Sequence, residues 1–432
     1  MTAPWSRSTL VLVFVFGVLS SKSAPALDEL VPAVECRERG GLPNFFAKLR
    51  NGGEVRIAYL GGSITAQDGW RPKTLNWFRE SFPTAKVSQI NAAIGGTGSD
   101  LGVFRLKHDV LDHKPDLVFV EFAVNDDGVP TNQIYRCMEG IVRQMFKNNP
   151  HTDVCFVYTL AEDMLETLQK GFLPRSASSM EKVADYYGIP SIHMGLEVAR
   201  LQQAGKVIFK GDKPKSETEK EALGGKILFS PDGVHPYTDS GHRLYLEAVV
   251  RSLSQIEKVG KAGPHSIPAP FVADNWEEAK MLPLSRAKLS PGWRQMDPKS
   301  DSLAKSFGNR LPGIWKASKQ GESLSFKFRG TTARIYDLVG PDCGQVSVAL
   351  DDRPAVIQPR FDAFCTYHRL SWLSIGEDLP QAVHTVKITI LPDQPDKAKI
   401  LARRNGKMDD PKRFDGTAWY AGGILLIGEL VE

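Results

Sequence analysis

Short apolar runs alternate with segments of helical periodicity from Val55 to about Leu253. The apolar runs are rich in β-branched and aromatic residues, as strands buried on both faces are: Val55–Leu60, Val87–Ile90, Leu117–Phe122, Val154–Tyr158 and Ile189–His193. Helical spacing covers segments between them: Lys73–Phe82, Leu101–Leu111, Thr131–Asn148 and Met180–Tyr187. This alternation predicts βαβ units and a mainly parallel sheet with helices on both faces.

The period changes to two after Pro291, where apolar and polar residues alternate over short runs that turn residues separate. Leu324, Phe326 and Phe328 begin the pattern, which continues with Val346, Val348, Leu350, Val386, Ile388 and Ile390. Short strands of this kind predict an antiparallel all-β domain, a sandwich or jelly roll. The charged segment Lys210–Glu221 is expected to be an exposed loop.

These patterns divide the chain into four parts. Residues 27–258 form the α/β domain, 259–291 a proline-rich connection, and 292–432 the β-sandwich domain. Residues 1–26 fit a signal peptide, because Arg7 precedes the apolar run Leu10–Leu19 and Ala24-Pro25-Ala26 offers a cleavage site. The run is about half of the ~20 residues that a spanning helix needs. We therefore expect a secreted or periplasmic protein without stable membrane insertion.

Composition narrows the class of protein only slightly. The 432 residues are 42% hydrophobic and 24% charged, with a net charge of +4, which indicates a globular protein and gives no reason to expect nucleic acid as a partner. Five cysteines leave at least one unpaired within the chain. Cys343 and Cys365 lie in the same region and are candidates for a disulfide. The sequence does not indicate an oligomeric state.

The stretch "AYLGGSITAQDGW" places Ser63 directly after the first predicted strand. Ligands of parallel sheets bind outside the carboxyl ends of the strands, so this serine is a candidate nucleophile. By itself, a serine between glycines is more often a turn residue. A catalytic serine needs a histidine base, which a carboxylate orients.

The stretch "SPDGVHPYTDSGH" offers that pair, because Asp232 lies three residues before His235. A turn of this length allows the carboxylate to reach Nδ1 and leaves Nε2 free to face Ser63. Acyl transfer also needs hydrogen-bond donors for the oxyanion. Two further strand ends supply candidates, Gly95 and Gly96 in "NAAIGGTGSD" and Asn125 in "EFAVNDDG".

The set "GGSIT", "NAAIGG", "AVND" and "DGVH" resembles, in order, the four blocks of the SGNH (GDSL-type) hydrolase superfamily. The resemblance implies a three-layer α/β/α fold close to the flavodoxin type and ester or amide hydrolysis without a metal or another cofactor. It implies a nucleophile, an acid and a base at Ser63, Asp232 and His235. The oxyanion donors would be the N–H groups of Ser63 and of Gly96, with Gly95 as an alternative, and the Asn125 side chain.

Two positions depart from the usual blocks. Gly62 replaces an aspartate, as in many carbohydrate-directed members, and Ala123 replaces a glycine. The rival α/β-hydrolase motif G-x-S-x-G does not fit, because Thr65 stands at its last glycine.

Other polar residues near the motifs have two interpretations. Gln67, Trp70, Arg71 and Arg105 could contact substrate or could pack within the fold. Asp126 and Asp127 invite a metal-site interpretation, but Asp126 is expected to brace its loop by hydrogen bonding. Four histidines are expected at the surface: His108, His113, His151 and His242.

The sequence therefore predicts a secreted serine esterase that removes ester-linked acyl groups from a polysaccharide or oligosaccharide. Acetyl is the expected acyl group. The substrate class follows from the resemblance alone. A lipid or aryl esterase is an alternative, and so is a glycan-binding protein whose site has lost activity. Aromatic residues of the β-sandwich could stack on sugars or belong to its core: Phe364, Tyr367, Trp372 and Trp419.

Overall fold

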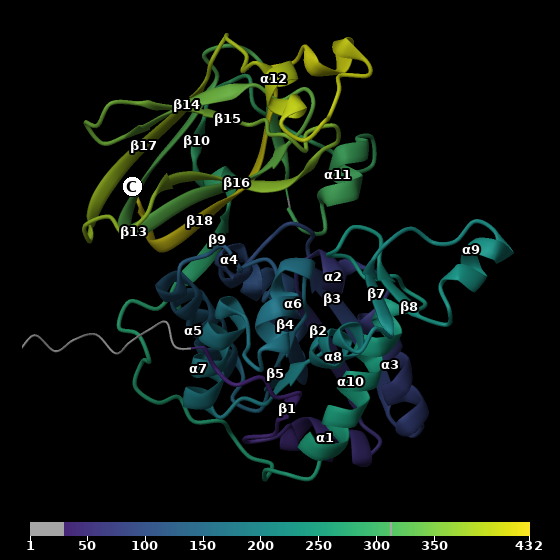
Figure 1. The fold of residues 1–432 in the computed structure, drawn as a ribbon. Coiled ribbons are helices and arrows are strands. Elements are labelled where there is room, and N and C mark those ends of the chain that lie inside the picture. Colours follow the sequence, from purple (N-terminus) through teal and green to yellow (C-terminus); the bar gives the residue numbers. More distant parts are fainter. Residues whose placement is uncertain (1–29, 312) are drawn as a thin grey trace, which may run out of the picture.

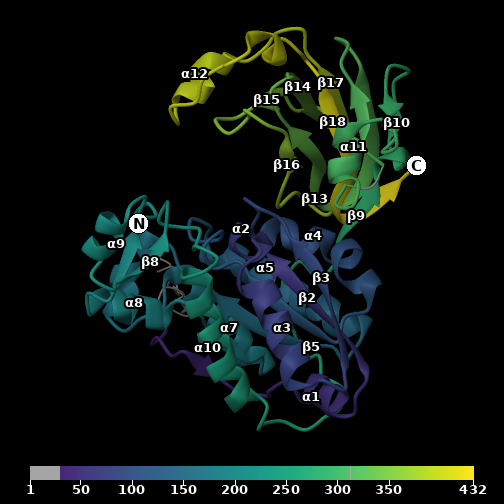
Figure 2. The ribbon, with the colours of Figure 1, turned by 90° about the vertical axis from the view of Figure 1, so that its right-hand side faces the viewer.

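The computed structural model describes residues 30–311 and 313–432 (Figure 1). The predicted signal peptide, residues 1–26, lies outside the described residues. Two bodies are visible, an α/β domain with the early part of the chain and an all-β domain with the late part (Figures 1 and 2).

The α/β domain is built on a six-stranded sheet with the order β1-β6-β5-β4-β2-β3. Its strands are β1 (Cys36–Arg37), β2 (Glu54–Gly61), β3 (Lys86–Ala93), β4 (Leu117–Glu121), β5 (Asp153–Tyr158) and β6 (Ser191–His193). All pairs are parallel except that of β1 with β6. The five parallel strands have the flavodoxin order 2-1-3-4-5, which places the topological switch point between β2 and β4. The predicted sheet is confirmed; the edge strand β1 is an addition.

Helices cover both faces of this sheet (Figure 1). One face carries α1 (Pro43–Arg50), α3 (Trp70–Ser81) and α10 (Gly241–Ile256), and the other carries α4 (Ser99–Asp109), α5 (Thr131–Asn148) and α7 (Arg175–Tyr187). The strands are apolar throughout because this arrangement buries both their faces; every residue of β4 and β5 is buried. The three-layer fold that the sequence predicted is therefore present.

Several smaller elements between β5 and α10 were not predicted. They are α6 (Leu165–Gln169), α8 (Leu196–Gln203), β7 (Val207–Lys210), α9 (Glu217–Ala222) and β8 (Ile227–Ser230). Strands β7 and β8 form a separate parallel pair, and β8 leads directly into the turn that contains Asp232 and His235. The charged segment Lys210–Glu221 is exposed as expected, but it is not all loop, because most of α9 lies in it; this helix has no buried residue.

The second domain is antiparallel, as predicted, and we call it the β domain. Its strands are β9 (Ala279–Pro283), β10 (Lys288–Leu289), β11 (Arg294–Gln295), β12 (Trp315–Ala317), β13 (Ser323–Val339), β14 (Gln345–Leu350), β15 (Val356–Pro359), β16 (Arg369–Gly376), β17 (Ala382–Ile390) and β18 (Trp419–Val431). The long strand β13 pairs with β17 along its first half, with β16 along its second half and with β18 on its other edge. Two short helices, α11 (Ser302–Phe307) and α12 (Lys397–Ala402), complete the domain.

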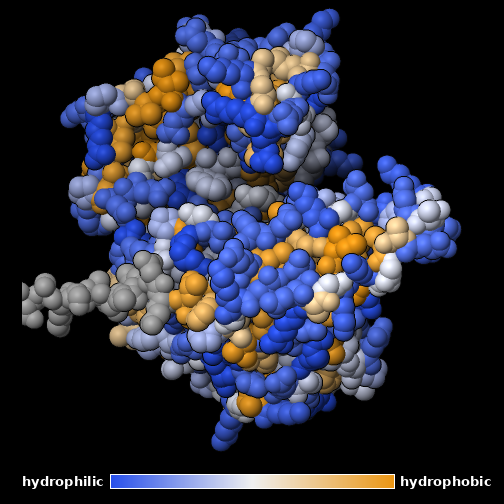
Figure 3. All heavy atoms as spheres, viewed as in Figure 1, coloured by the Kyte–Doolittle hydropathy of each residue, from blue (hydrophilic) through white to orange (hydrophobic). Residues whose placement is uncertain are grey.

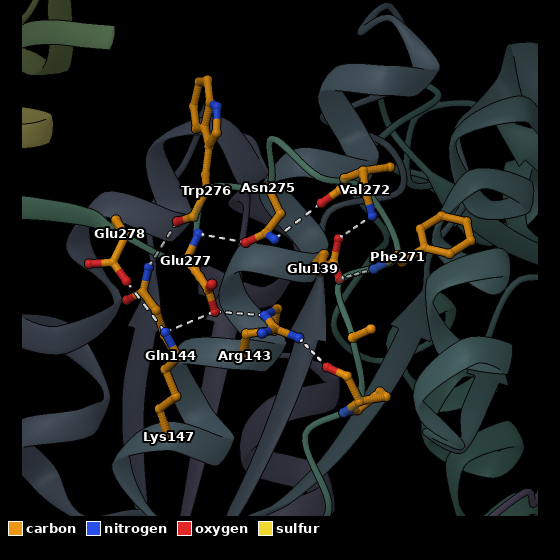
Figure 4. A network of polar contacts seen from close by, with 12 residues as sticks. Glu139, Arg143, Gln144, Lys147, Phe271, Val272, Asn275, Trp276, Glu277 and Glu278 are labelled. Carbon is orange, nitrogen blue, oxygen red and sulfur yellow. Dashed lines mark hydrogen bonds and ion pairs between the residues drawn. The ribbon is translucent and has the colours of Figure 1, made fainter. Parts of the chain in front are cut away.

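The proline-rich connection is tightly bound to the α/β domain. The Glu139 carboxylate on α5 accepts the backbone N–H groups of Phe271 and Val272, and Arg143 forms an ion pair with Glu277 at 2.6 Å (Figure 4). The same segment contains β9, which pairs with β18 and so belongs to the β domain's sheet. The connection therefore joins the two domains through contacts to both.

Aromatic and cysteine residues have mostly structural positions in the β domain. Trp419 is buried and donates its indole N–H to Asp337 at 2.8 Å, whereas Phe364 and Tyr367 are exposed. All five cysteines are free thiols, so the candidate pairing of Cys343 with Cys365 is not formed.

The face shown in Figure 3 is mostly hydrophilic, with separate apolar groups on both domains. No helix among the described residues has the length and apolar character needed to cross a membrane.

Candidate active site

Ser63 is the first residue of the short helix α2 (Ser63–Ala66), which begins where β2 ends. Ser63 therefore lies at the carboxyl edge of the sheet. Figures 1 and 2 show α2 on the side of the α/β domain that faces the β domain. Its side chain is partly exposed. No acceptor for the Ser63 backbone N–H exists among the described residues.

The imidazole of His235 joins Ser63 to Asp232. His235 Nε2 lies 2.8 Å from Ser63 Oγ, and His235 Nδ1 lies 2.7 Å from Asp232 Oδ2. When Nδ1 carries the proton and donates it to the carboxylate, Nε2 is free to accept the serine proton. The arrangement therefore has the order of donors and acceptors that general-base activation of a serine requires.

A network of hydrogen bonds holds the Asp232 carboxylate in this orientation. Its Oδ1 atom accepts the N–H groups of Val234 and His235 at 2.9 and 2.8 Å, and the Ser230 hydroxyl lies 3.1 Å away. Burial alone would raise the pKa of Asp232, but the hydrogen bonds from His235 and Val234 lower it far below its ordinary value. Asp232 is therefore ionised throughout the neutral range and remains a constant acceptor for His235.

Three more donors lie near the serine without an acceptor among the described residues: the N–H groups of Gly95 and Gly96 and the side-chain amide of Asn125. Gly95 faces Ser63, since a Cβ there would lie 3.5 Å from Ser63 Cβ. Gly96 adopts a φ of +71°, which side-chain-bearing residues rarely adopt. The turn thus depends on the second glycine and brings the first close to the nucleophile. Unpaired donors around one hydroxyl are the groups that an oxyanion needs.

Gly62 is packed directly against Asn125. A Cβ atom at position 62 would lie only 1.8 Å from Asn125 Oδ1 and 2.7 Å from its Cγ. The glycine that replaces the usual aspartate therefore allows the Asn125 amide to occupy the space beside Ser63, where any side chain at position 62 would displace it.

Two buried carboxylates support these loops. Glu121, the last residue of β4, accepts the hydroxyls of Thr65 at 2.9 Å and Thr159 at 2.7 Å as well as the Gly62 N–H. Burial raises the pKa of Glu121 despite these bonds. Asp126 accepts the Ser99 N–H at 3.0 Å, and burial raises its pKa to about 7.

Three of the four residues considered for substrate contact are buried. Trp70 donates its indole N–H to Thr65 at 3.3 Å, Arg71 binds the Thr65 carbonyl at 3.1 Å, and Arg105 binds the Ala92 carbonyl at 2.5 Å. Their burial favours the packing interpretation. Gln67 is partly exposed.

His242 was expected at the surface, and that expectation is wrong. Its ring is buried, its Nδ1 accepts the Trp70 N–H at 3.0 Å, and its Nε2 lies 3.1 Å from Gln67 Oε1. Gly69 makes room for it, because a Cβ there would lie 2.2 Å from the ring. His242 therefore joins the helix that follows His235 to the segment that follows Ser63.

One group of metal-ligand type occurs among the described residues, and it lies in the β domain. Ligand atoms of Asp342, Cys343 and His368 lie within 4.8 Å of one another. His368 Nε2 lies in hydrogen-bond contact with Asp342 at 2.7 Å, and this contact explains why the two side chains are close together without a metal ion between them.

The segment that contains the candidate catalytic residues is similar to a known protein family. Residues 59–244 match the model of the GDSL-like lipase/acylhydrolase family, and this segment contains Ser63, Gly96, Asn125, Asp232 and His235. The segment is therefore similar to that family, and the match supports an ester-hydrolysing enzyme, as the four motifs predicted. The α/β domain is called the hydrolase domain below.

Two solved structures resemble the whole chain. One is a two-domain esterase (CEX) active on acetylated mannans co-crystallised with mannopentaose: 21% identical, TM-score 0.67. The other is a structure of a two-domain esterase (CEX) active on acetylated mannans, 20% identical, TM-score 0.68. Each match covers 91% of this chain and 97% of the other. The likeness establishes the fold of both domains. No curated protein sequence matches the chain.

Substitution of Gly62 tests the close approach of Asn125. Gly62→Ala should lower kcat for 4-nitrophenyl acetate by about tenfold or more, because a displacement of about 1 Å in such a site is enough to cost that much. Gly128→Ala is the matched control: its Cβ would meet nothing within 4 Å, and its activity should equal that of the wild type. Equal activity of both variants would contradict the packing described.

The pKa of His242 predicts a pH dependence of stability. Burial lowers this pKa to about 4, below the ordinary value of 6.5. Between these values the unfolded chain binds a proton that the folded chain does not, so the free energy of unfolding decreases as pH falls through the window. His242→Gln should make that slope shallower, by at most roughly 1.4 kcal/mol per pH unit.

Denaturant unfolding at several pH values in this window measures the slope. The exposed His151 provides the control, since His151→Gln should leave the slope as it is in the wild type. A His242→Gln variant with the wild-type slope would show that His242 is not buried as a neutral ring.

Proposed function

We propose that the chain is a serine esterase in which Ser63 is the nucleophile, His235 the general base and Asp232 the residue that orients the base. The observation that carries the proposal is the continuous chain of contacts, 2.8 Å from Ser63 Oγ to His235 Nε2 and 2.7 Å from His235 Nδ1 to Asp232 Oδ2. Each atom has the partner that its part in acyl transfer requires.

In the proposed reaction, His235 Nε2 removes the hydroxyl proton while Ser63 Oγ attacks the acyl carbonyl carbon. The carbonyl oxygen becomes an oxyanion that accepts hydrogen bonds from the Ser63 N–H, the Gly96 N–H and the Asn125 amide. When the C–O bond to the alcohol breaks, His235 returns its proton to the leaving oxygen. Water then attacks the acyl-enzyme with His235 again as the base, which releases the acid and restores the serine.

We propose acetyl groups on a neutral glycan of the mannan type as the substrate. Support comes from the likeness of both domains to an esterase active on acetylated mannans. The surface next to Asp232 gives further support: a depression there is lined by the acidic residues Asp127, Glu162 and Asp163 besides Val124, Ala161, Met164, Gly233 and Val234. Carboxylates accept hydrogen bonds from sugar hydroxyls and repel an anionic glycan.

Two alternatives make different demands on the site. A lipid or aryl esterase needs an apolar acyl pocket, so its rate should rise with the length of the acyl chain. A glycan-binding protein without activity would have no need for a serine, histidine and aspartate in hydrogen-bond contact. Export through residues 1–26 and the domain boundaries at 258 and 291 stay predictions.

Hydrolysis of acetylated mannan and of 4-nitrophenyl acetate tests the nucleophile and the base. Ser63→Ala and His235→Ala should each lower kcat by roughly 10³-fold or more on both substrates, because removal of one member disables the unit. Ser178→Ala, a buried hydroxyl of α7, controls for the loss of a serine as such. Wild-type rates in Ser63→Ala would exclude the proposed function.

Substrate choice separates the alternatives. Acetate release from mannan should exceed release from an acetylated polygalacturonate, and 4-nitrophenyl esters should react more slowly as the acyl chain lengthens. Faster hydrolysis of long-chain esters would favour the lipid esterase, and glycan binding without hydrolysis would favour the binding protein.

A further inference from the structure

The turn with the candidate oxyanion glycines is short and has few internal bonds. We call residues 94–98, between β3 and α4, the oxyanion loop. Within it, Thr97 Oγ1 donates to the Ile94 carbonyl at 2.9 Å; outside it, the Ile94 N–H donates to the carbonyl of Gly61 at the end of β2, at 3.0 Å. Gly95 and Gly96 are exposed and flexible by composition. The position of their N–H groups therefore depends on how the two ends of the loop are held.

Arg310 of the β domain holds the first end. It comes from the segment that follows α11, and its guanidinium donates to the carbonyls of Asn91 and Ala93, the latter at 3.5 Å. It also lies 3.8 Å from Asp109. Arg105 of the hydrolase domain binds the carbonyl between those two, that of Ala92. The last residues of β3 are thus fixed by two arginines, one from each domain.

Arg334 of the β domain holds the second end. It lies on β13, is 4% exposed, and donates to the Asp100 carboxylate at 3.1 Å and to the Asp100 carbonyl at 3.3 Å. Aromatic rings of both domains surround its guanidinium at 5.2 to 5.6 Å: Phe104, Trp276 and Trp372. Glu377 accepts its Nε at 3.0 Å. A buried, charge-assisted contact of this kind fixes position as well as adding stability.

Asp100 stands in the first turn of α4, which is also linked to Asn125. The Ser99 N–H donates to Asp126 Oδ1, the residue after Asn125. Gly98 allows this contact, because a Cβ there would lie 2.3 Å from the same oxygen. Through Ser99 and Asp126, the end of the loop that Arg334 holds is joined to the loop of the third oxyanion donor.

We propose that Arg310 and Arg334 are positioning residues for the oxyanion loop, so that the β domain is part of the catalytic unit of the hydrolase domain and not only an attached module. The proposal rests on the proposed function, since it assigns the oxyanion donors to this loop. It follows from the placement of the two arginines: each comes from the β domain, and they bind the chain on opposite sides of Gly95 and Gly96.

A third arginine between the domains supplies a matched control. Arg136 on α5 pairs with Asp274 and, at 3.0 Å, with Asp378 of the β domain. Its side chain is 15% exposed, close to the 17% of Arg310. None of its partners belongs to the oxyanion loop or to its ends. Loss of Arg136 therefore weakens the contact between the domains without releasing the loop.

The test measures kcat and KM of the full chain with 4-nitrophenyl acetate, a substrate too small to need a glycan-binding surface. Arg310→Ala and Arg334→Ala should lower kcat by about tenfold or more and change KM by less than about threefold, because misplaced oxyanion donors affect the transition state more than the bound ester. Arg136→Ala should keep both constants. Arg334→Lys should recover part of the kcat, since its ammonium still reaches Asp100.

Thermal unfolding of each variant separates positioning from stability. The proposal is overturned if folded Arg310→Ala and Arg334→Ala keep the kcat of Arg136→Ala, or if all three variants lose the same activity. Should Arg334→Ala not fold, Asp100→Ala decides instead: it removes the side-chain acceptor of Arg334 from the hydrolase side, and wild-type kcat in that variant rejects the proposal. Failure of the proposed function would show separately, as activity in Ser63→Ala.

Discussion

The buried carboxylate of Glu121 is the contact on which the arrangement around the serine depends. It ends β4, and it accepts donors from the residues that follow β2 and β5, namely Gly62, Thr65 and Thr159. A carboxyl group without a cation is costly to bury unless its hydrogen bonds are made. Three neighbouring strand ends are therefore tied to one point, and the serine loop cannot shift without breaking one of these bonds.

From that point the structure adds constraints outward. Gly62 gives Asn125 its place beside Ser63, and His242 links α10, the helix that follows the His235 turn, to the segment that follows Ser63. Further out, Arg310 and Arg334 of the β domain bind both ends of the oxyanion loop. The site is thus assembled from elements far apart in the sequence, most of which do not touch the substrate position themselves.

The sequence predicted the parts of this structure that follow from local pattern. Apolar runs identified the parallel strands, and glycine, serine, asparagine and histidine motifs identified their carboxyl ends. The sequence did not predict that His242 is buried. The space for its ring exists because residue 69, far away in the sequence, is a glycine and has no Cβ atom. Strand β9 was hidden in a proline-rich segment because its pairing partner, β18, lies near the end of the chain. Strands β7 and β8 are four residues each, too short for a periodic signal.

The sequence shows where the chain departs from the family pattern, but it does not show which contacts these residues make. The sequence shows Gly62 in place of the usual aspartate, and the structure shows what this glycine allows, the contact with the Asn125 amide. In the same way, Arg310 and Arg334 are ordinary residues of a β-sandwich by pattern. Their partners in the hydrolase domain are more than two hundred residues away in sequence, so no local signal points to them.

The proposed function requires that His235 and Asp232 activate Ser63 for attack at a carbonyl carbon. Reaction with diethyl 4-nitrophenyl phosphate, followed by peptide mapping by mass spectrometry, tests it most directly, because this reagent labels an activated serine without turnover. We expect one diethylphosphoryl group per chain, on Ser63, and a much slower reaction in His235→Ala. Labelling at another residue, or equally fast labelling of Ser63 without His235, would contradict it.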